Sequence, residues 1–188
     1  MALPQERRYT LEDMLAWEEG VRIELVDGIP TMHAAPSRRH QEVSGELFAL
    51  LHDYLRGKQC KVYHAPFSVR PFETADDRPG SVDTVVEPDI TVVCDPDKLD
   101  DIGCKGAPDM VAEILSPSTR QHDRLVKYDL YERAGVREYW IVDPDTETVQ
   151  VYQLEEGHYH AAQVYTRQSK VKVEVLEDCF IDLDRVFG

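Results

Sequence analysis

The chain has 188 residues, 42% of them hydrophobic, and its 36 acidic and 21 basic side chains give a formal net charge of -15. This length can bury one sizeable core, so we expect a single domain over residues 1–188, with 1–35 appended to the core. The negative charge opposes non-specific attraction to nucleic acid and to anionic membranes. No stretch approaches the roughly 18 apolar residues of a membrane span, and the N-terminal segment lacks the apolar core of a signal peptide. We therefore expect a cytoplasmic protein without membrane contact.

The four cysteines are Cys60, Cys94, Cys104 and Cys179, and none belongs to a CxxC pair. Two of them stand beside apolar residues of predicted strands. This usage predicts reduced, partly buried thiols and argues against a zinc site.

A helix and a hairpin are predicted at the N-terminus. Thr10 is a typical N-cap, and the helix it opens has an apolar side that continues to Gly20. Strands over 22–26 and 29–33 flank an Asp-Gly turn. Glu24 alternates with apolar neighbours, so it either faces solvent or lines a site.

A long core helix follows over 38–55, because Ser37 is a typical N-cap and apolar residues recur after it at helical spacing. His40 lies near the start of this helix, where it is either a solvated end residue or part of a site. Residues 60–69 alternate enough to predict one strand, and the Pro, Asp and Gly residues of 70–81 predict a loop.

Two apolar strands then each deliver a carboxylate. Asp89 directly precedes the strand 90–94, and Glu113 stands inside the apolar run 111–115, which ends at a Ser-Pro. A charge inside such a run must be paired, neutralised or bound to a metal ion. Asp89 as a turn residue and Glu113 as a salt-bridged core residue are the structural alternatives.

The next predicted helix carries a lysine. Ser118 and Thr119 form a candidate cap, and the helix over 121–134 buries apolar residues that include Leu125. Lys127 lies on its second or third turn, where Asp123, four residues earlier, offers an ordinary surface ion pair as the alternative.

A strand over 138–143 follows this helix, so the strand, helix and strand predict a crossover with parallel pairing. The segments 149–152, 160–165, 171–175 and 180–183 then predict a largely antiparallel C-terminal third.

Carboxylates at the ends of neighbouring strands are suited to Mg²⁺ or Mn²⁺, which prefer oxygen ligands and keep several waters. Such an ion can activate a water and stabilise the charge of a phosphodiester transition state, while an ammonium group orients the water. Asp89, Glu113 and Lys127 therefore indicate a metal site for phosphodiester chemistry.

Several motifs together resemble one known family. They are 87–90 (EPDI), 112–119 (AEILSPST), Asp123, Lys127, Tyr131, 135–144 (GVREYWIVDP), 23–28 and 36–40. The set is similar to the signature of the Uma-two family of putative restriction endonucleases, a branch of the PD-(D/E)XK nuclease superfamily, over about residues 9–187. The resemblance implies a mixed α/β fold with a restriction-endonuclease-like core, a mixed central sheet flanked by helices, with Asp89 and Glu113 as metal ligands.

One position departs from the superfamily pattern. Leu115 stands two residues after Glu113, where the superfamily places a lysine on the same strand face. In this branch the basic residue is thought to come from the following helix, which points to Lys127.

Two functions from different classes are consistent with these features. The first is an Mg²⁺-dependent or Mn²⁺-dependent endonuclease that hydrolyses phosphodiester bonds, with DNA as the expected substrate and RNA or a small phosphoester as alternatives. The second is a catalytically inactive nuclease-fold protein that serves as a binding or assembly module, favoured by the charge of -15. The expected site residues are Asp89, Glu113, Lys127, His40 and Glu24, with Asp89, Glu113 and the Ile114 carbonyl on the metal.

The C-terminal strands also predict an assembly. They exceed what one crossover core needs, and Val149, Val151, Tyr152 and Leu154 offer apolar surface. Strand edges and apolar faces are commonly covered by a partner, and symmetric dimers are the commonest closed assembly. We therefore expect a homodimer through this half, the alternative being strands that fold back on their own domain.

Overall fold

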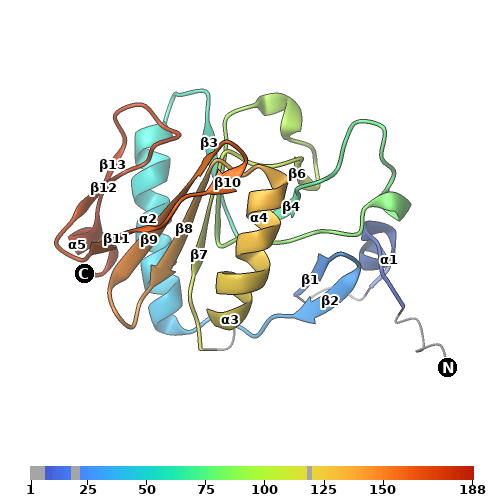
Figure 1. Cartoon of the computed structure of the whole chain (residues 1–188), viewed down its shortest axis with the longest axis horizontal. Helices are drawn as coiled ribbons and strands as arrows, with labels where there is room; N and C mark the ends of the chain where they lie inside the picture. Colours follow the sequence, from blue (N-terminus) through green and yellow to red (C-terminus); the bar gives the residue numbers. More distant parts are fainter. Residues whose placement is uncertain (1–6, 18–21, 118–119) are drawn as a thin grey trace.

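A mixed β-sheet with helices on both faces forms the centre of the computed structural model (Figure 1), which describes residues 7–17, 22–117 and 120–188. The strand order is β10-β9-β8-β7-β5-β3, and β11 also pairs with β9. β7 and β8 are parallel, and the other pairs of this sheet are antiparallel. The strands are β3 (Lys61–His64), β5 (Ile90–Val93), β7 (Met110–Ile114), β8 (Glu138–Asp143), β9 (Thr148–Glu155), β10 (His158–Tyr159) and β11 (Gln163–Thr166).

Each face of the sheet packs on a different helix, because successive strand residues point to opposite faces. Ala112 and Ile114 of β7 are buried in one cluster with residues of α2 (Arg38–Leu55). Val111 is buried in a second cluster with residues of α4 (Tyr128–Ala134). The same alternation places the side chain of Glu113 on the α4 face, inside an otherwise apolar strand.

Three smaller sheets and the remaining helices surround this core. In Figure 1, α1 and the β1–β2 hairpin lie at one end of the molecule, and α5 with β12 and β13 lies at the other. These elements are α1 (Leu11–Leu15), β1 (Ile23–Val26), β2 (Ile29–Met32), β4 (Ser68–Arg70), η1 (Pro79–Ser81), η2 (Pro96–Lys98), β6 (Gly103–Lys105), β12 (Lys170–Lys172), β13 (Phe180–Asp182) and α5 (Leu183–Val186).

The predicted architecture is confirmed: a mixed α/β fold with a mixed central sheet, flanking helices and antiparallel C-terminal strands. The core helix begins directly after Ser37, as predicted. Ser37 is its N-cap, since the Ser37 hydroxyl accepts the His40 N–H at 3.2 Å. The single strand predicted over 60–69 is wrong, since the chain turns at Pro66 and divides it into β3 and β4. α1 ends at Leu15, and the predicted end of that helix at Gly20 lies outside the described residues.

The helix predicted over 121–134 is interrupted by a π turn. α3 (Arg120–His122) leads into η3 (Asp123–Lys127), a π-helix, which continues as α4. A π turn holds more residues than an α turn and therefore changes the helix face on which preceding residues lie. Leu125 is 62% exposed for this reason, so its predicted burial is wrong. The Ser118 and Thr119 cap lies outside the described residues.

The prediction of four reduced thiols is wrong for two of them. Cys60 directly precedes β3 and Cys94 directly follows β5, and the register of these strands pairs Lys61 with Val93. The two cysteines therefore lie opposite each other, and they form a disulfide. Cys104 and Cys179 are free and buried. No helix of the described chain is both long and apolar enough to cross a membrane.

The apolar residues of β9 that predicted the dimer are covered within the domain. Val149 and Val151 are buried in the cluster that α2 shares with the sheet. Tyr152 contacts the rings of Tyr128 and Tyr139, at centroid distances of 5.1 and 6.0 Å. The apolar surface expected from these β9 residues is thus internal, and the premise of the dimer prediction is wrong for them.

Candidate metal and catalytic site

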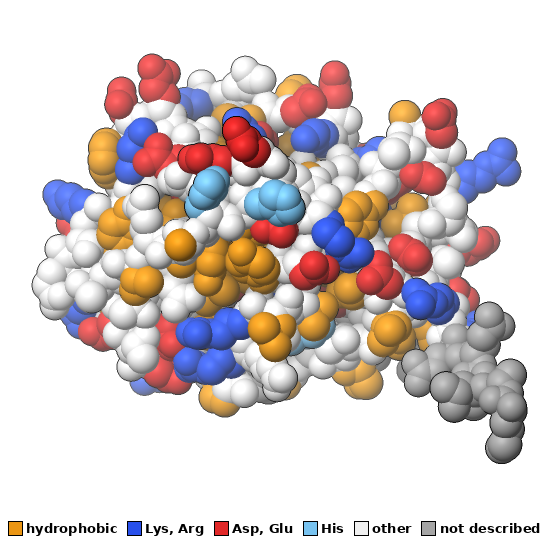
Figure 2. All heavy atoms as spheres, viewed as in Figure 1, with side chains coloured by type: hydrophobic (Ala, Val, Ile, Leu, Met, Phe, Trp, Pro, Cys, Tyr) orange, Lys and Arg blue, Asp and Glu red, His pale blue; other side chains and the backbone are white. Residues whose placement is uncertain are grey.

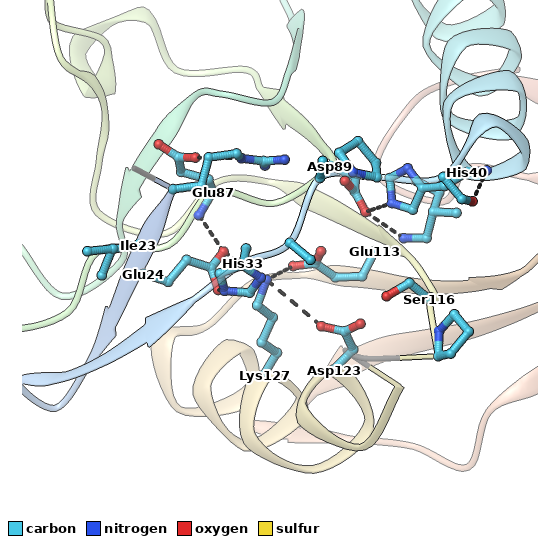
Figure 3. A pocket seen from close by; sticks show the side chains of 17 residues that line it. Ile23, Glu24, His33, His40, Glu87, Asp89, Glu113, Ser116, Asp123 and Lys127 are labelled. Carbon is cyan, nitrogen blue, oxygen red and sulfur yellow. Dashed lines mark hydrogen bonds and ion pairs between the residues drawn. The ribbon is translucent and has the colours of Figure 1, made fainter. Parts of the chain in front are cut away.

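A cavity of about 160 Å³ lies where the hairpin β1–β2, the start of β5, the end of β7 and the π turn meet (Figure 3). The strands and the π turn deliver charged side chains to this point. The charged and imidazole side chains that line it are Arg22, Glu24, His33, His40, Glu87, Asp89, Glu113, Asp123 and Lys127.

Asp89 and Glu113 come together through the pairing of β5 with β7. The antiparallel register matches Ile90 with Ala112, so Asp89 lies beside Glu113. The Ile114 N–H donates to Asp89 Oδ2 at 2.9 Å. His40 Nε2, from the first turn of α2, lies 3.1 Å from the same oxygen.

Lys127 joins Glu113 to the hairpin. Its Nζ donates to Glu113 Oε1 at 2.8 Å and to Glu24 Oε1 at 2.9 Å (Figure 3). The side chains of all three residues are no more than 4% exposed. Lys127 also lies 3.9 Å from Asp123, so a single ammonium group faces three buried carboxylates.

Glu24 is held in place by two further contacts. Its Oε1 accepts the Glu87 N–H at 2.8 Å, and its Oε2 lies 2.9 Å from His33 Nε2. Backbone hydrogen bonds between Leu25 and Val85 fasten β1 to the segment that leads to Asp89. The hairpin therefore adds a third carboxylate to the pair that the central sheet provides.

The two carboxylates that share Lys127 differ in their proton affinity. Burial raises the pKa of Glu113 to about 8, with the like charges of Asp123, Asp89 and Glu24 acting in the same direction against the attraction of Lys127. Burial also acts to raise the pKa of Glu24, but Lys127 and the hydrogen bond of His33 outweigh it and hold that pKa below its ordinary value. The negative charge around Lys127 thus exceeds what one ammonium group neutralises.

The helix adds a hydroxyl group to Glu113. The Tyr131 OH donates to Glu113 Oε1 at 2.7 Å, and the Tyr131 side chain is fully buried. Burial raises the pKa of Tyr131 well above its ordinary value, so this phenol remains a donor.

The five predicted site residues surround this cavity, together with Ile114, whose backbone N–H contacts Asp89. Three structural alternatives are wrong. Glu24 does not face solvent, His40 is buried at the helix start, and Asp123 and Lys127 form a buried ion pair and not a surface one.

Three residues of the site were missed as functional candidates: His33, Asp123 and Tyr131. His33 lies two residues beyond Thr31, the register partner of Glu24, so the hairpin pattern contained a signal for it. Asp123 and Tyr131 stand four residues before and after Lys127, a spacing that places side chains on one helix face.

Comparisons with known proteins identify the family and the fold of the chain. Residues 11–184 match the Uma2 family, which is described as "Putative restriction endonuclease". The chain belongs to this family. An uncharacterized protein of Synechocystis, slr1290, is 28% identical over 144 residues, which are 75% of this chain and 72% of that protein.

A solved structure shares the fold of this Uma2 chain. It is the crystal structure of a putative nuclease belonging to DUF820 from Anabaena variabilis, with a TM-score of 0.74 and 20% identity. The similarity covers 95% of this chain and 97% of that one. The family and the fold together indicate a nuclease of the restriction-endonuclease type.

The acidic side chains of this Uma2 protein suit a hard divalent cation. Asp89 Oδ1 and Glu113 Oε2 accept no hydrogen bond from the described part of the chain, while their partner oxygens do. Magnesium is commonly bound through one or two carboxylates, with water and substrate phosphate completing its coordination. Within the described residues, no group of three or more His, Cys, Asp and Glu side chains is arranged to hold a metal ion.

The basic side chains near the cavity are largely paired with acids. On the face viewed in Figure 2, the acidic and basic groups of the described residues are interspersed, and this face shows no broad basic patch. The pairs are Arg38 with Glu42, Arg39 with Glu147, Arg120 with Asp143 and Asp145, and Arg124 with Asp143.

Proposed function

We propose that the protein is an endonuclease that uses Mg²⁺ or Mn²⁺ to hydrolyse phosphodiester bonds, with DNA as its substrate. The observation that carries the proposal is the position of Asp89, Glu113 and Lys127 around one cavity. Two carboxylates with one free oxygen each, beside a lysine, form the minimal set for metal-assisted attack of water on a phosphodiester.

Each residue has a distinct part in this proposal. Asp89 and Glu113 hold the ion, with the Ile114 carbonyl as the expected backbone ligand. When bound, the ion supplies an activated water and positive charge at the phosphate. Lys127 orients the attacking water and stabilises the charge that develops on the phosphate oxygens. Glu24 anchors the lysine, and His40 fixes the Asp89 carboxylate through Oδ2.

The excess of buried negative charge supports the cation. Glu24, Asp89 and Glu113 line the cavity, and among the described residues Lys127 brings one buried ammonium group to it. Buried charges are stable only when they are paired, protonated or bound to a metal ion. A divalent cation would supply the missing positive charge and keep Glu113 ionised at neutral pH.

A catalytically inactive binding module is the second candidate. The net charge of -15 favours it, together with the ion pairs that engage the arginines near the cavity. In that case Lys127 would serve as a permanent substitute for the metal charge. Metal binding and strand cleavage therefore distinguish the two candidates.

Replacement of Asp89 by alanine tests the proposed function. We expect the wild type to bind Mn²⁺ in isothermal titration and to nick supercoiled plasmid, and Asp89→Ala to lose both, because half of the carboxylate pair is removed. Asp53→Ala is the matched control, since Asp53 pairs with Arg56 on the exposed side of α2 and should leave both unchanged. A wild type that neither binds Mn²⁺ nor nicks DNA would contradict the endonuclease proposal and favour the binding-module alternative.

We also propose that the protein acts as a homodimer, since cleavage of two strands is served by two sites. The apolar side chains of Val164 (β11) and Phe180 (β13) are 60% and 59% exposed. Both lie in the C-terminal half, where a partner subunit could cover them. Light scattering is expected to give twice the 21.6 kDa mass of the chain. Val164→Glu should return the protein to the monomer mass, and a wild-type mass of 21.6 kDa at tens of micromolar would contradict the dimer.

A further inference from the structure

We propose that Tyr131 is a positioning residue for Glu113: its phenol fixes one carboxylate oxygen so that the other faces the cavity and binds the metal ion. This inference rests on the proposed function, because it assigns a task within the same metal site. It adds to that site a residue that contacts neither substrate nor metal.

The hydrogen bonds to Glu113 are all on one side of the carboxylate. Oε1 accepts from Tyr131 at 2.7 Å and from Lys127 at 2.8 Å, so both lone pairs of this oxygen have a donor. Oε2 accepts no hydrogen bond within the described chain. A carboxylate held in this way has a defined orientation and keeps one oxygen for a ligand.

Tyr131 is better suited than Lys127 to hold this orientation through a reaction cycle. Lys127 divides its hydrogen bonds between Glu113 and Glu24, and its proposed task is at the water and the phosphate. The Tyr131 hydroxyl has Glu113 as its hydrogen-bond partner, and its fully buried ring packs edge-on against Tyr139 at a centroid distance of 5.0 Å. When Lys127 engages substrate, Tyr131 still donates to Oε1.

The π turn explains why this donor reaches Glu113. Four residues make slightly more than one turn of an α-helix, so side chains four apart are rotated slightly around the helix axis. A π turn holds more residues, so four of them make less than one turn and the rotation has the opposite sign. The combination of η3 with α4 therefore keeps Asp123, Lys127 and Tyr131 on one line facing β7. Such π turns are frequent at functional sites, where they place side chains that a regular helix would turn away.

Mn²⁺ titration of Tyr131→Phe and Tyr159→Phe tests the inference. Loss of a group that orients a metal ligand typically weakens metal affinity 10- to 100-fold, so we expect about a tenfold higher dissociation constant for Tyr131→Phe. Tyr159 is the matched control, because its hydroxyl also donates a buried hydrogen bond, to the Val136 carbonyl at 2.9 Å, but does not contact Glu113. Tyr159→Phe should lower the thermal midpoint comparably and retain the wild-type affinity.

The outcomes separate this inference from the proposed function. A wild type that fails to bind Mn²⁺ overturns both. A wild type that binds Mn²⁺, together with a Tyr131→Phe variant of equal affinity, overturns the role of Tyr131 and leaves the proposed function in place. A similar loss of affinity in Tyr159→Phe would also overturn it, since the effect would then be a general loss of packing.

A measurement on the wild-type protein covers the case in which Tyr131→Phe does not fold. With tyrosine labelled at the ring carbon that carries the hydroxyl, the Tyr131 resonance is expected to shift on addition of Mg²⁺, because its acceptor becomes a metal ligand. The Tyr159 resonance should stay in place. Mg²⁺ binding that leaves the Tyr131 resonance unmoved would overturn the inference.

Discussion

Replacement of Lys127 by methionine is expected to destabilise the fold and to abolish most turnover while leaving metal binding intact. Removing one partner of a buried ion pair leaves uncompensated charge, so the unfolding free energy at neutral pH should fall by about 3 kcal/mol. The loss should be larger at pH 8 than at pH 5, because Glu24 and Glu113 are more easily protonated at the lower pH. Turnover should fall at least about 100-fold, since a preorganised positive group is lost.

The metal affinity of Lys127→Met should equal or exceed that of the wild type, because the ammonium group repels the cation at close range. Urea unfolding, plasmid nicking and Mn²⁺ titration measure the three effects separately. Lys105→Met is the matched control: Lys105 also faces two acids, at 3.7 and 3.9 Å, but it is 37% exposed, and exposed pairs contribute roughly 1 kcal/mol or less. An equal loss of metal affinity in Lys127→Met and Asp89→Ala would contradict this division of labour.

The sequence predicted the two acids of the site because their placement depends on local features. Asp89 and Glu113 adjoin strands whose apolar runs can be read directly, and the antiparallel register then makes them neighbours. The helix over 38–55 was equally predictable, since its cap and its apolar spacing are both contained in the segment. The strands and the helix can be predicted without distant contacts, whereas the register of β5 with β7 cannot.

Other parts of the site depend on long-range packing, which local patterns do not encode. Glu24 becomes a site residue because β1 bonds to the segment before Asp89, where the Glu87 N–H, 63 residues along the chain, donates to Glu24. The disulfide similarly follows from the register of β3 with β5, which brings together cysteines 34 residues apart. The alternation of apolar residues around Glu24 does not decide whether its side chain faces solvent or lines the site.

The π turn marks the limit of prediction from periodicity. Regular α spacing predicts Leu125 as buried, whereas the inserted residue moves Leu125 outward, and Asp123, Lys127 and Tyr131 share the buried side. No local signal in this segment predicts the turn. In the sequence, Asp123, Lys127 and Tyr131 are linked only by their four-residue spacings, which a surface ion pair explains equally well.

The cluster of acids has an energetic consequence that can be measured without substrate. Glu113 is buried, it faces other carboxylates, and its pKa lies at about 8, above its ordinary value of 4.5. The folded protein therefore binds one more proton than the unfolded chain between those two pH values. Stability must then fall as the pH rises from about 4.5 to about 8 in the absence of metal, because the folded state gives up that proton only at a cost.

Replacement of Glu113 by glutamine should remove this dependence and stabilise the metal-free fold at alkaline pH. Glutamine keeps a carbonyl oxygen for Tyr131 and Lys127 but has no charge to bury, so the two proteins should be similar in stability at pH 5. The variant should gain up to about 4 kcal/mol over the wild type at pH 9, while it loses Mn²⁺ binding. Urea unfolding in EDTA from pH 5 to pH 9 measures the unfolding free energy of both proteins. Burial also raises the pKa of Glu138 to about 7, but Glu138 is present in both proteins, so its effect cancels when the two free energies are subtracted. Parallel stability curves for the two proteins would mean that Glu113 is already ionised at pH 5 and that the cavity has no deficit of positive charge for a cation to supply.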